Sequence, residues 1–167
     1  GNLGYVACAG EILAQAADEK MKFEAVVVAT GSGGTQGGLV AGMQLLDGAP
    51  VIGIAVEGDR REQEALATRQ AVESLRLLGR ADIDLSGQVN VMDDFVGPGY
   101  ARPTDAMREA LGLGARFEGL VLDPVYTGKA FAGFLSLARS GRFDKKQSLL
   151  FVHTGGTPGL FGYPESV

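Results

Sequence analysis

A glycine-rich loop at residues 29–35 is the first segment whose composition could bind a ligand. The loop reads ATGSGGT, follows an apolar run, and precedes a helical pattern. Backbone N–H groups and the helix dipole at such a junction bind phosphate. No lysine follows as in a Walker A loop, and the spacing departs from GxGxxG. The loop predicts a phosphate site, with a simple tight turn as the alternative. Its candidate binding residues are Gly31, Ser32, Gly33, Gly34 and Thr35.

Three later segments combine glycine with groups that can move protons. They read GPGY (97–100), LDPVYTGK (122–129) and FVHTGGTP (151–158). Tyr100 in its Gly-Pro-Gly turn is hard to explain by packing, whereas Tyr126 alone is more typical of a core aromatic. The single histidine, His153, is by itself more typical of a structural residue. Lys129 follows Tyr126 by three positions, and we predict a cation at the surface or behind the site.

Alternating strand and helix patterns position these segments. Strands are predicted at 24–29, 51–56, 89–92 and 148–152, with a short strand or extended piece at 120–122. Helices are predicted at 3–21, 35–46, 63–78, 103–111 and 126–139. Thr104 is the expected N-cap of the fourth helix. The alternation is typical of an α/β domain with a parallel sheet.

The sequence therefore predicts one α/β domain over residues 1–167, built as a three-layer α/β/α sandwich with a mostly parallel sheet. Open parallel sheets bind ligands beyond the carboxyl ends of their strands. We expect the glycine loop at that edge and at a helix N-terminus. Tyr126 and Thr154 should face the same cleft.

Taken together, the four motifs resemble the D-cysteine desulfhydrase and 1-aminocyclopropane-1-carboxylate deaminase family. These are pyridoxal-phosphate (PLP) enzymes of fold type II, the fold of the tryptophan-synthase β subunit, and this chain would be their larger cofactor domain. The resemblance runs over essentially the whole chain, in order and at compatible spacings. It implies that residues 31–35 hold the PLP phosphate and that Thr154 faces the pyridine nitrogen. It also implies catalytic roles for Tyr100 and Tyr126, with Thr127 supporting the same wall.

Family members hold the cofactor through a lysine near their N-terminus, in a Gly-Asn-Lys context that this sequence lacks. Its lysines, none in such a setting, are Lys20, Lys22, Lys129, Lys145 and Lys146. The chain thus resembles the C-terminal half only, without the smaller domain. We expect it to be inactive alone.

Within the resemblance, Thr127 and Thr154 match the desulfhydrases, whereas the deaminase has glutamate and leucine there. The implied reaction is α,β-elimination of D-cysteine to pyruvate, ammonia and sulfide. A cysteate sulfo-lyase and a 1-aminocyclopropane-1-carboxylate deaminase are the alternatives within the family. A non-catalytic phosphate- or PLP-binding fragment is the alternative of another class.

The composition limits the binding partners, the location and the metal sites that we expect for this protein. A net charge of −5 argues against nucleic-acid binding, and no apolar run is long enough for a membrane span. We therefore expect a cytoplasmic protein, and the resemblance implies that it acts on a small amino acid. One cysteine excludes an internal disulfide and a multi-cysteine zinc site, and no metal is expected. Apolar surface left exposed where a missing domain would pack predicts a homodimer.

Overall fold

The four strands found in the described part of the chain, residues 1–163, lie parallel in one sheet of order β3-β2-β1-β4. They are β1 (Phe23–Thr30), β2 (Val51–Ala55), β3 (Asn90–Met92) and β4 (Ser148–Phe151). This computed structural model confirms the predicted parallel sheet and all four of its main strands. The last four residues of the predicted 1–167 domain lie outside the description.

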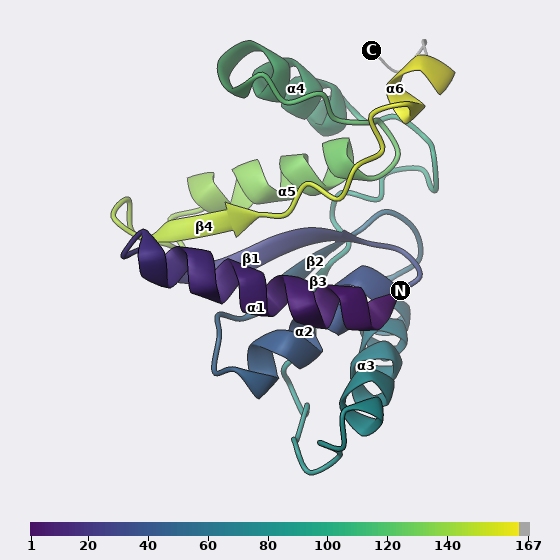
Figure 1. The fold of residues 1–167 in the computed structure, drawn as a ribbon. Coiled ribbons are helices and arrows are strands. Elements are labelled where there is room, and N and C mark those ends of the chain that lie inside the picture. Colours follow the sequence, from purple (N-terminus) through teal and green to yellow (C-terminus); the bar gives the residue numbers. More distant parts are fainter. Residues whose placement is uncertain (164–167) are drawn as a thin grey trace.

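Helices cover both faces of the sheet (Figure 1). One face carries α1 (Asn2–Asp18), α2 (Gly34–Leu45) and α3 (Arg60–Leu77), and the other carries α5 (Thr127–Arg139). The predicted three-layer arrangement is therefore confirmed. The remaining long helix, α4 (Asp105–Leu113), packs on α5 on the side away from the sheet.

The central strand β1 is buried on both faces, as its unbroken apolar run predicts. Val26 and Val28 pack with α1, α2 and α3, whereas Ala25 and Val27 pack with α5. Because successive strand residues point to opposite faces, one strand joins the two halves of the core. This burial fixes the position of the loop that follows β1.

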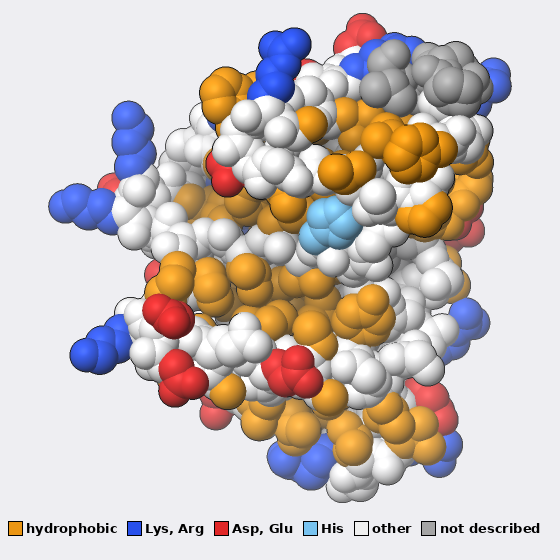
Figure 2. Space-filling model, turned by 45° about the horizontal axis from the view of Figure 1, so that its top comes forward, with side chains coloured by type: hydrophobic (Ala, Val, Ile, Leu, Met, Phe, Trp, Pro, Cys, Tyr) orange, Lys and Arg blue, Asp and Glu red, His pale blue; other side chains and the backbone are white. Residues whose placement is uncertain are grey.

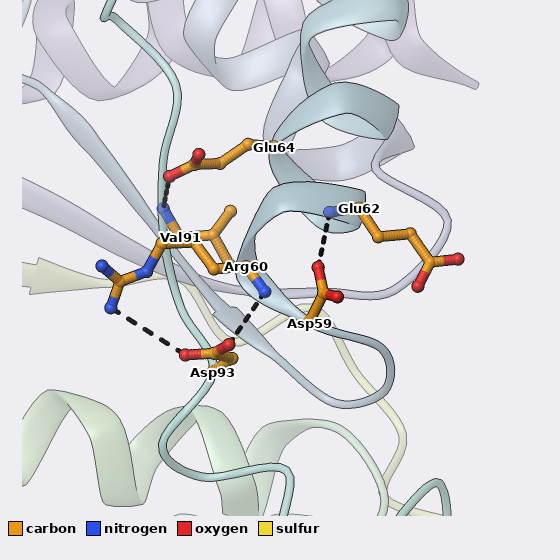
Figure 3. Close-up of polar contacts among 6 residues, drawn as sticks. All are labelled: Asp59, Arg60, Glu62, Glu64, Val91 and Asp93. Carbon is orange, nitrogen blue, oxygen red and sulfur yellow. Dashed lines mark hydrogen bonds and ion pairs between the residues drawn. The ribbon is translucent and has the colours of Figure 1, made fainter.

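The start of α3 is tied to the edge strand β3 (Figure 3). Asp59 caps α3 by accepting a hydrogen bond from a backbone N–H of the first turn at 2.8 Å. The Arg60 N–H donates to Asp93 at 2.9 Å, and Glu64 accepts from the Val91 N–H at 3.3 Å. The hydrogen bond to Glu64 satisfies a backbone donor on the side of β3 that pairs with no other strand.

Several element boundaries differ from the prediction. Helix α1 ends at Asp18 rather than at residue 21, because Lys20 adopts a left-handed conformation with φ 53°. The cap of α4 is confirmed, since the Thr104 hydroxyl accepts from the Met107 N–H at 3.1 Å. The sequence did not predict the short α6 (Gly159–Gly162).

Residues 120–122 do not form a strand. A π-helical turn, η1 (Gly114–Glu118), extends α4, and the Leu120 N–H closes it on the Gly114 carbonyl at 3.0 Å. Leu122 is buried between α4 and α5. The apolar residues Leu120 and Leu122 therefore serve helix packing and not strand pairing, whereas Val121 is exposed.

Candidate functional site

The glycine loop lies where β1 ends and α2 begins, at the carboxyl edge of the sheet, as predicted. Gly33 is the N-cap of α2 with φ 76°, a conformation that L side chains rarely adopt. A Cβ placed on Gly33 would lie 2.7 Å from the backbone nitrogen of Ala67 in α3. Glycine is thus required here both by the backbone conformation and by the close approach of α3.

The start of α2 presents free backbone donors. The first N–H used inside the helix is that of Gly37, which donates to the Gly33 carbonyl at 2.8 Å. The preceding N–H groups have no intrahelical acceptor, and they carry the positive end of the helix dipole. The Thr30 hydroxyl beside them is buried and has no hydrogen-bond partner within residues 1–163. These donors can hold an anion.

A cavity of about 180 Å³ lies in front of this loop. Its lining consists of Ala29, Thr30, Gly31, Ser32, Gly33, Gly34, Thr35, Glu57, Tyr126 and Thr154. The structure therefore brings the predicted loop together with Tyr126 and Thr154 from two distant segments, as expected. Ligand pockets commonly measure roughly 300–1,000 Å³, so this cavity matches a phosphate and part of a larger ligand.

The two predicted catalytic tyrosines are paired. Their hydroxyl oxygens lie 2.6 Å apart, and their rings meet edge to face with centroids 5.8 Å apart. Tyr100 does not line the cavity itself, but it reaches the site through Tyr126. The hydrogen bond with Tyr100, partial burial and the nearby negative Glu57 and Asp123 raise the pKa of Tyr126 to about 12. At neutral pH Tyr126 is therefore protonated and acts as a donor rather than a base.

Asp123 holds the backbone around Tyr126. One of its oxygens accepts from the N–H groups of Val125 (2.9 Å) and Tyr126 (2.8 Å). The other accepts from the N–H (2.8 Å) and the hydroxyl (2.7 Å) of Thr127. A carboxylate at the N-terminus of α5 is also favoured by the helix dipole. Asp123 thus sets the direction from which Tyr126 enters the cavity.

Thr127 lies behind the cavity and not in its lining. The residue is buried, and its hydroxyl donates to the Asp123 carboxylate while accepting from the Asp123 N–H at 2.9 Å. The expectation that Thr127 supports the wall of the site fits this position. Direct contact with a ligand in the cavity does not, because Thr127 is absent from the lining and its hydroxyl proton is already donated to Asp123.

The segment after β4 carries Thr154 beside a structural histidine. His153 Nδ1 accepts from the Gly155 N–H at 3.1 Å, so its Nε2 carries the proton and lies 3.3 Å from the Val121 carbonyl. A side chain at Gly156 would collide with the Asp123 carboxylate. His153 therefore orients the chain on which Thr154 lies, as its structural interpretation predicted.

Lys129 is fully buried, and the prediction of a surface position is wrong. Its ammonium group donates to the carbonyls of Val96 at 2.7 Å and Gly99 at 2.8 Å. Burial lowers the pKa of Lys129. Its place on α5, between the sheet and the loop before Tyr100, removes it from solvent. The alternative prediction, a cation behind the site, agrees with this position.

Sequence reasoning did not single out Glu57 or Asp123. Glu57 directly follows β2, the neighbour of β1, so its position at the carboxyl edge of a parallel sheet was an available signal. No residue-type signal marked Asp123, because its role depends on the turn that starts α5. The four lysines other than Lys129 are exposed, and no lysine lines the cavity.

Residues 1–163 offer neither a metal-binding cluster nor a membrane-spanning helix. No cluster of three His, Cys, Asp or Glu side chains could hold a metal ion there. No helix in the same range combines the length and apolarity that a membrane span needs.

The sheet and the site define an α/β domain with a loop at its carboxyl edge whose free N–H donors can hold an anion. Residues 1–155 match the family described as pyridoxal-phosphate dependent enzyme. The chain belongs to this family, and pyridoxal phosphate is the cofactor of its members.

Curated relatives named D-cysteine desulfhydrase are similar over the whole chain. The protein of Yersinia enterocolitica serotype O:8 is 44% identical over 176 residues, which cover 100% of this chain and 50% of that protein. The protein of Salmonella newport is 41% identical over 166 residues, covering 98% of this chain and 49% of that protein. The chain therefore spans about half the length of the curated relatives it matches.

Solved structures show the same fold. The crystal structure of an ACC deaminase homologue aligns with a TM-score of 0.84 and 36% identity, covering 99% of this chain and 48% of that one. The crystal structure of a T.th. threonine deaminase aligns with a TM-score of 0.57 and 20% identity, over 89% of this chain and 55% of that one. These likenesses confirm the predicted fold type II architecture.

The residues present fit pyridoxal phosphate. The donors at the start of α2 suit its phosphate, and the buried Thr30 hydroxyl offers a further unused group. Thr154, also in the cavity lining, offers a neutral hydroxyl. The only carboxylate in the lining is Glu57, and Tyr126 is uncharged at neutral pH.

Proposed function

We propose that this chain is the cofactor-cradling half of a PLP-dependent D-cysteine desulfhydrase, which converts D-cysteine to pyruvate, ammonia and sulfide. The observation that carries the proposal is the meeting of the anion-binding loop, Thr154 and the Tyr100–Tyr126 pair at one sheet edge. The names of relatives that are 41–44% identical across the chain support this substrate.

Each part of the site has a distinct role in this proposal. The N–H groups at the start of α2, with the hydroxyls of Ser32 and Thr35, hold the phosphate. The Thr154 hydroxyl would hydrogen-bond to the pyridine nitrogen of the cofactor. When bound, PLP withdraws electrons from the α-carbon of an amino acid and so eases loss of its proton.

The tyrosine pair then orients the substrate and donates protons. Because the pKa of Tyr126 is raised to about 12, its phenol keeps its proton at neutral pH. A group of this kind serves as a hydrogen-bond donor or general acid, so a different group must accept the α-proton. The lysine that family members carry near their N-terminus is the group we propose for that task.

A deaminase acting on 1-aminocyclopropane-1-carboxylate is the second candidate. The similarity to the ACC deaminase homologue structure, at a TM-score of 0.84 and 36% identity, favours it. The same phosphate loop and tyrosine pair would serve either substrate. The higher identity to proteins named D-cysteine desulfhydrase supports that reaction as our first candidate.

A fusion tests the proposal. Residues 1–167 are joined to the N-terminal half of the Yersinia relative, and pyruvate is measured with D-cysteine, L-cysteine and 1-aminocyclopropane-1-carboxylate. We expect D-cysteine-dependent pyruvate and sulfide from the fusion, and a decrease of roughly 10²-fold or more in kcat for the Tyr126→Phe variant. Ammonia and 2-oxobutyrate from the cyclopropane substrate alone would favour the deaminase.

The chain alone is the negative control. No lysine lines the cavity, so we expect no pyruvate above the level of free PLP. PLP binding without turnover would agree with the proposal for the separate half. Sulfide release by the chain alone would show that one of its five lysines does the work assigned to the absent one.

We further propose that the chain self-associates through apolar surface. Figure 2 shows hydrophobic side chains gathered across one face. The large apolar residues exposed over the described chain include Leu3, Met21, Leu46, Leu77, Phe117 and Phe161. Contiguous apolar surface commonly finds a partner, so light scattering should show a homodimer, and a monomer at high concentration would oppose this.

The cytoplasmic location stays a prediction.

A further inference from the structure

Lys129 is the largest of the fully buried side chains. Its ammonium group donates to two backbone carbonyls, those of Val96 and Gly99. No carboxylate of residues 1–163 forms an ion pair with it. The two carbonyls flank the Gly-Pro turn, so the lysine bridges the two ends of this turn.

Stability of the helix does not explain a lysine at this position. Lys129 is the third residue of α5, where the positive end of the helix dipole disfavours a cation. Burying an ammonium group also costs free energy, which an apolar side chain of similar volume would avoid. The benefit must therefore lie in the loop that the ammonium group binds.

Few other hydrogen bonds fix that loop, although Gly97 packs closely against Thr104. Gly97 and Gly99 have φ values of 67° and 143°, so the backbone follows neither a helix nor a strand. A weak turn contact joins the Arg102 N–H to the Gly99 carbonyl at 3.2 Å. Tyr100 comes directly after the Gly99 carbonyl that Lys129 binds at 2.8 Å.

We propose that Lys129 is a positioning residue that holds Tyr100 against Tyr126, a role whose catalytic meaning rests on the proposed function. Helix α5 starts directly after Tyr126 and carries Lys129 less than one turn later. One helix therefore places both phenols: Tyr126 through its own backbone and Tyr100 through the Gly99 carbonyl. The 2.6 Å contact between the hydroxyls depends on both connections.

Lys129→Met tests this role because it keeps the volume and removes the donors. Lys145→Met, at an exposed lysine, is the matched control for the loss of charge. Cleavage after Tyr100 by chymotrypsin reports opening of the loop, and cleavage after the exposed Phe161 reports protease activity elsewhere in the same chain. We expect Lys129→Met alone to accelerate cleavage after Tyr100 about tenfold or more, at unchanged cleavage after Phe161.

The tyrosinate absorbance titration is the second readout. In Lys129→Met the contact between the hydroxyls should be lost, and the pKa of Tyr126 should fall from about 12 toward its ordinary value of 10.0. A folded Lys129→Met protein with unchanged cleavage and unchanged titration would overturn the proposal. In the fusion, kcat should fall with little change in KM.

Two further measurements keep the test decisive. If Lys129→Met does not fold, Lys129→Gln retains one amide donor group and should give intermediate cleavage. In the wild-type chain, the bond after Tyr100 should resist chymotrypsin while the bond after Phe161 is cut, and rapid cleavage after Tyr100 would itself overturn the proposal. An inactive fusion would remove the proposed function but leave the cleavage and titration results to decide on Lys129.

Discussion

The hydroxyl oxygens of Tyr100 and Tyr126 lie 2.6 Å apart, although 26 positions separate the two residues in the chain. The pair joins the loop after β3 to the start of α5. Only Tyr126 lines the cavity, so Tyr100 acts on it through the other phenol. The contact can be followed experimentally because it changes the pKa of Tyr126.

Tyr100→Phe removes the first of the causes that raise the pKa of Tyr126. We expect this pKa to fall from about 12 toward 10.0, with partial burial and the two nearby carboxylates retaining part of the increase. Tyrosinate absorbance during an alkaline titration measures the change. Tyr5→Phe in α1 is the control and should only remove one tyrosine from the titration. A Tyr126 pKa still near 12 in Tyr100→Phe would assign the increase to burial and the two carboxylates and not to the Tyr100 contact.

The same contact makes folding stability depend on pH in the alkaline range. In the unfolded chain Tyr126 ionises near pH 10, whereas in the folded chain its pKa is about 12. The stabilisation is therefore complete below pH 10 and is lost as the pH rises toward 12. Urea unfolding at pH 8, 10 and 11 should show a smaller alkaline loss for Tyr126→Phe than for the wild-type chain. Equal losses would show that Tyr126 contributes nothing to this slope.

The sequence predicted the parts of this fold that depend on local pattern. The buried run of β1 and the glycine loop after it were located correctly, because burial on both faces and φ above zero leave clear marks in sequence. The burial of Lys129 left no such mark. A charged side chain is usually exposed. The two acceptors of Lys129 are backbone carbonyls some 30 positions away, and because every residue has such a carbonyl, no residue type marks them in the sequence.

Other features were missed for related reasons. The Asp123 carboxylate accepts four hydrogen bonds from the next four residues, but in the sequence the Asp-Pro pair indicates only a turn. The segment 120–122 has an apolar pattern short enough for either a strand or a packed connection, and only the tertiary position of α4 decides between them. A local sequence pattern does not specify the contacts between segments that are distant in the chain.

Asp123→Asn should weaken the start of α5. The amide keeps one acceptor oxygen and brings an NH₂ group toward backbone N–H donors that the carboxylate now satisfies. Lost hydrogen bonds to a buried charged group should lower the free energy of unfolding by roughly 2–4 kcal/mol. Asp82→Asn, which breaks an exposed ion pair with Arg80, should change it by no more than about 0.5 kcal/mol. Urea denaturation compares the two variants, and equal effects would contradict the role of Asp123.

Gly33→Ala should damage the phosphate loop more than its φ value alone predicts. Gly87 is a matched control, because its φ is 71° and a Cβ there meets nothing within 4 Å. Gly87→Ala therefore shows the cost of the backbone conformation, about 1–3 kcal/mol. Gly33→Ala adds a collision with the backbone of Ala67 in α3. We expect a larger loss of unfolding free energy and loss of inorganic phosphate binding by calorimetry, and equal losses for both variants would contradict the proposed close approach.

Glu57→Gln tests the electrostatics of the cavity, because Glu57 is the only carboxylate in its lining. A negative side chain beside an anion-binding loop opposes the phosphate, and it also contributes to the raised pKa of Tyr126. Neutralising it should strengthen binding of inorganic phosphate by roughly 5- to 30-fold, a value typical of one charge a few ångströms away in a partly hydrated site. The pKa of Tyr126 should decrease at the same time.

Calorimetry with phosphate at low and high salt measures this effect, since screening should reduce the difference between variant and wild type. Glu118→Gln, at an exposed residue outside the cavity lining, controls for net charge and should leave both phosphate affinity and the Tyr126 titration unchanged. Weaker phosphate binding in Glu57→Gln would mean that the carboxylate organises the loop by accepting hydrogen bonds from it. In that case its charge would assist the anion site instead of opposing it.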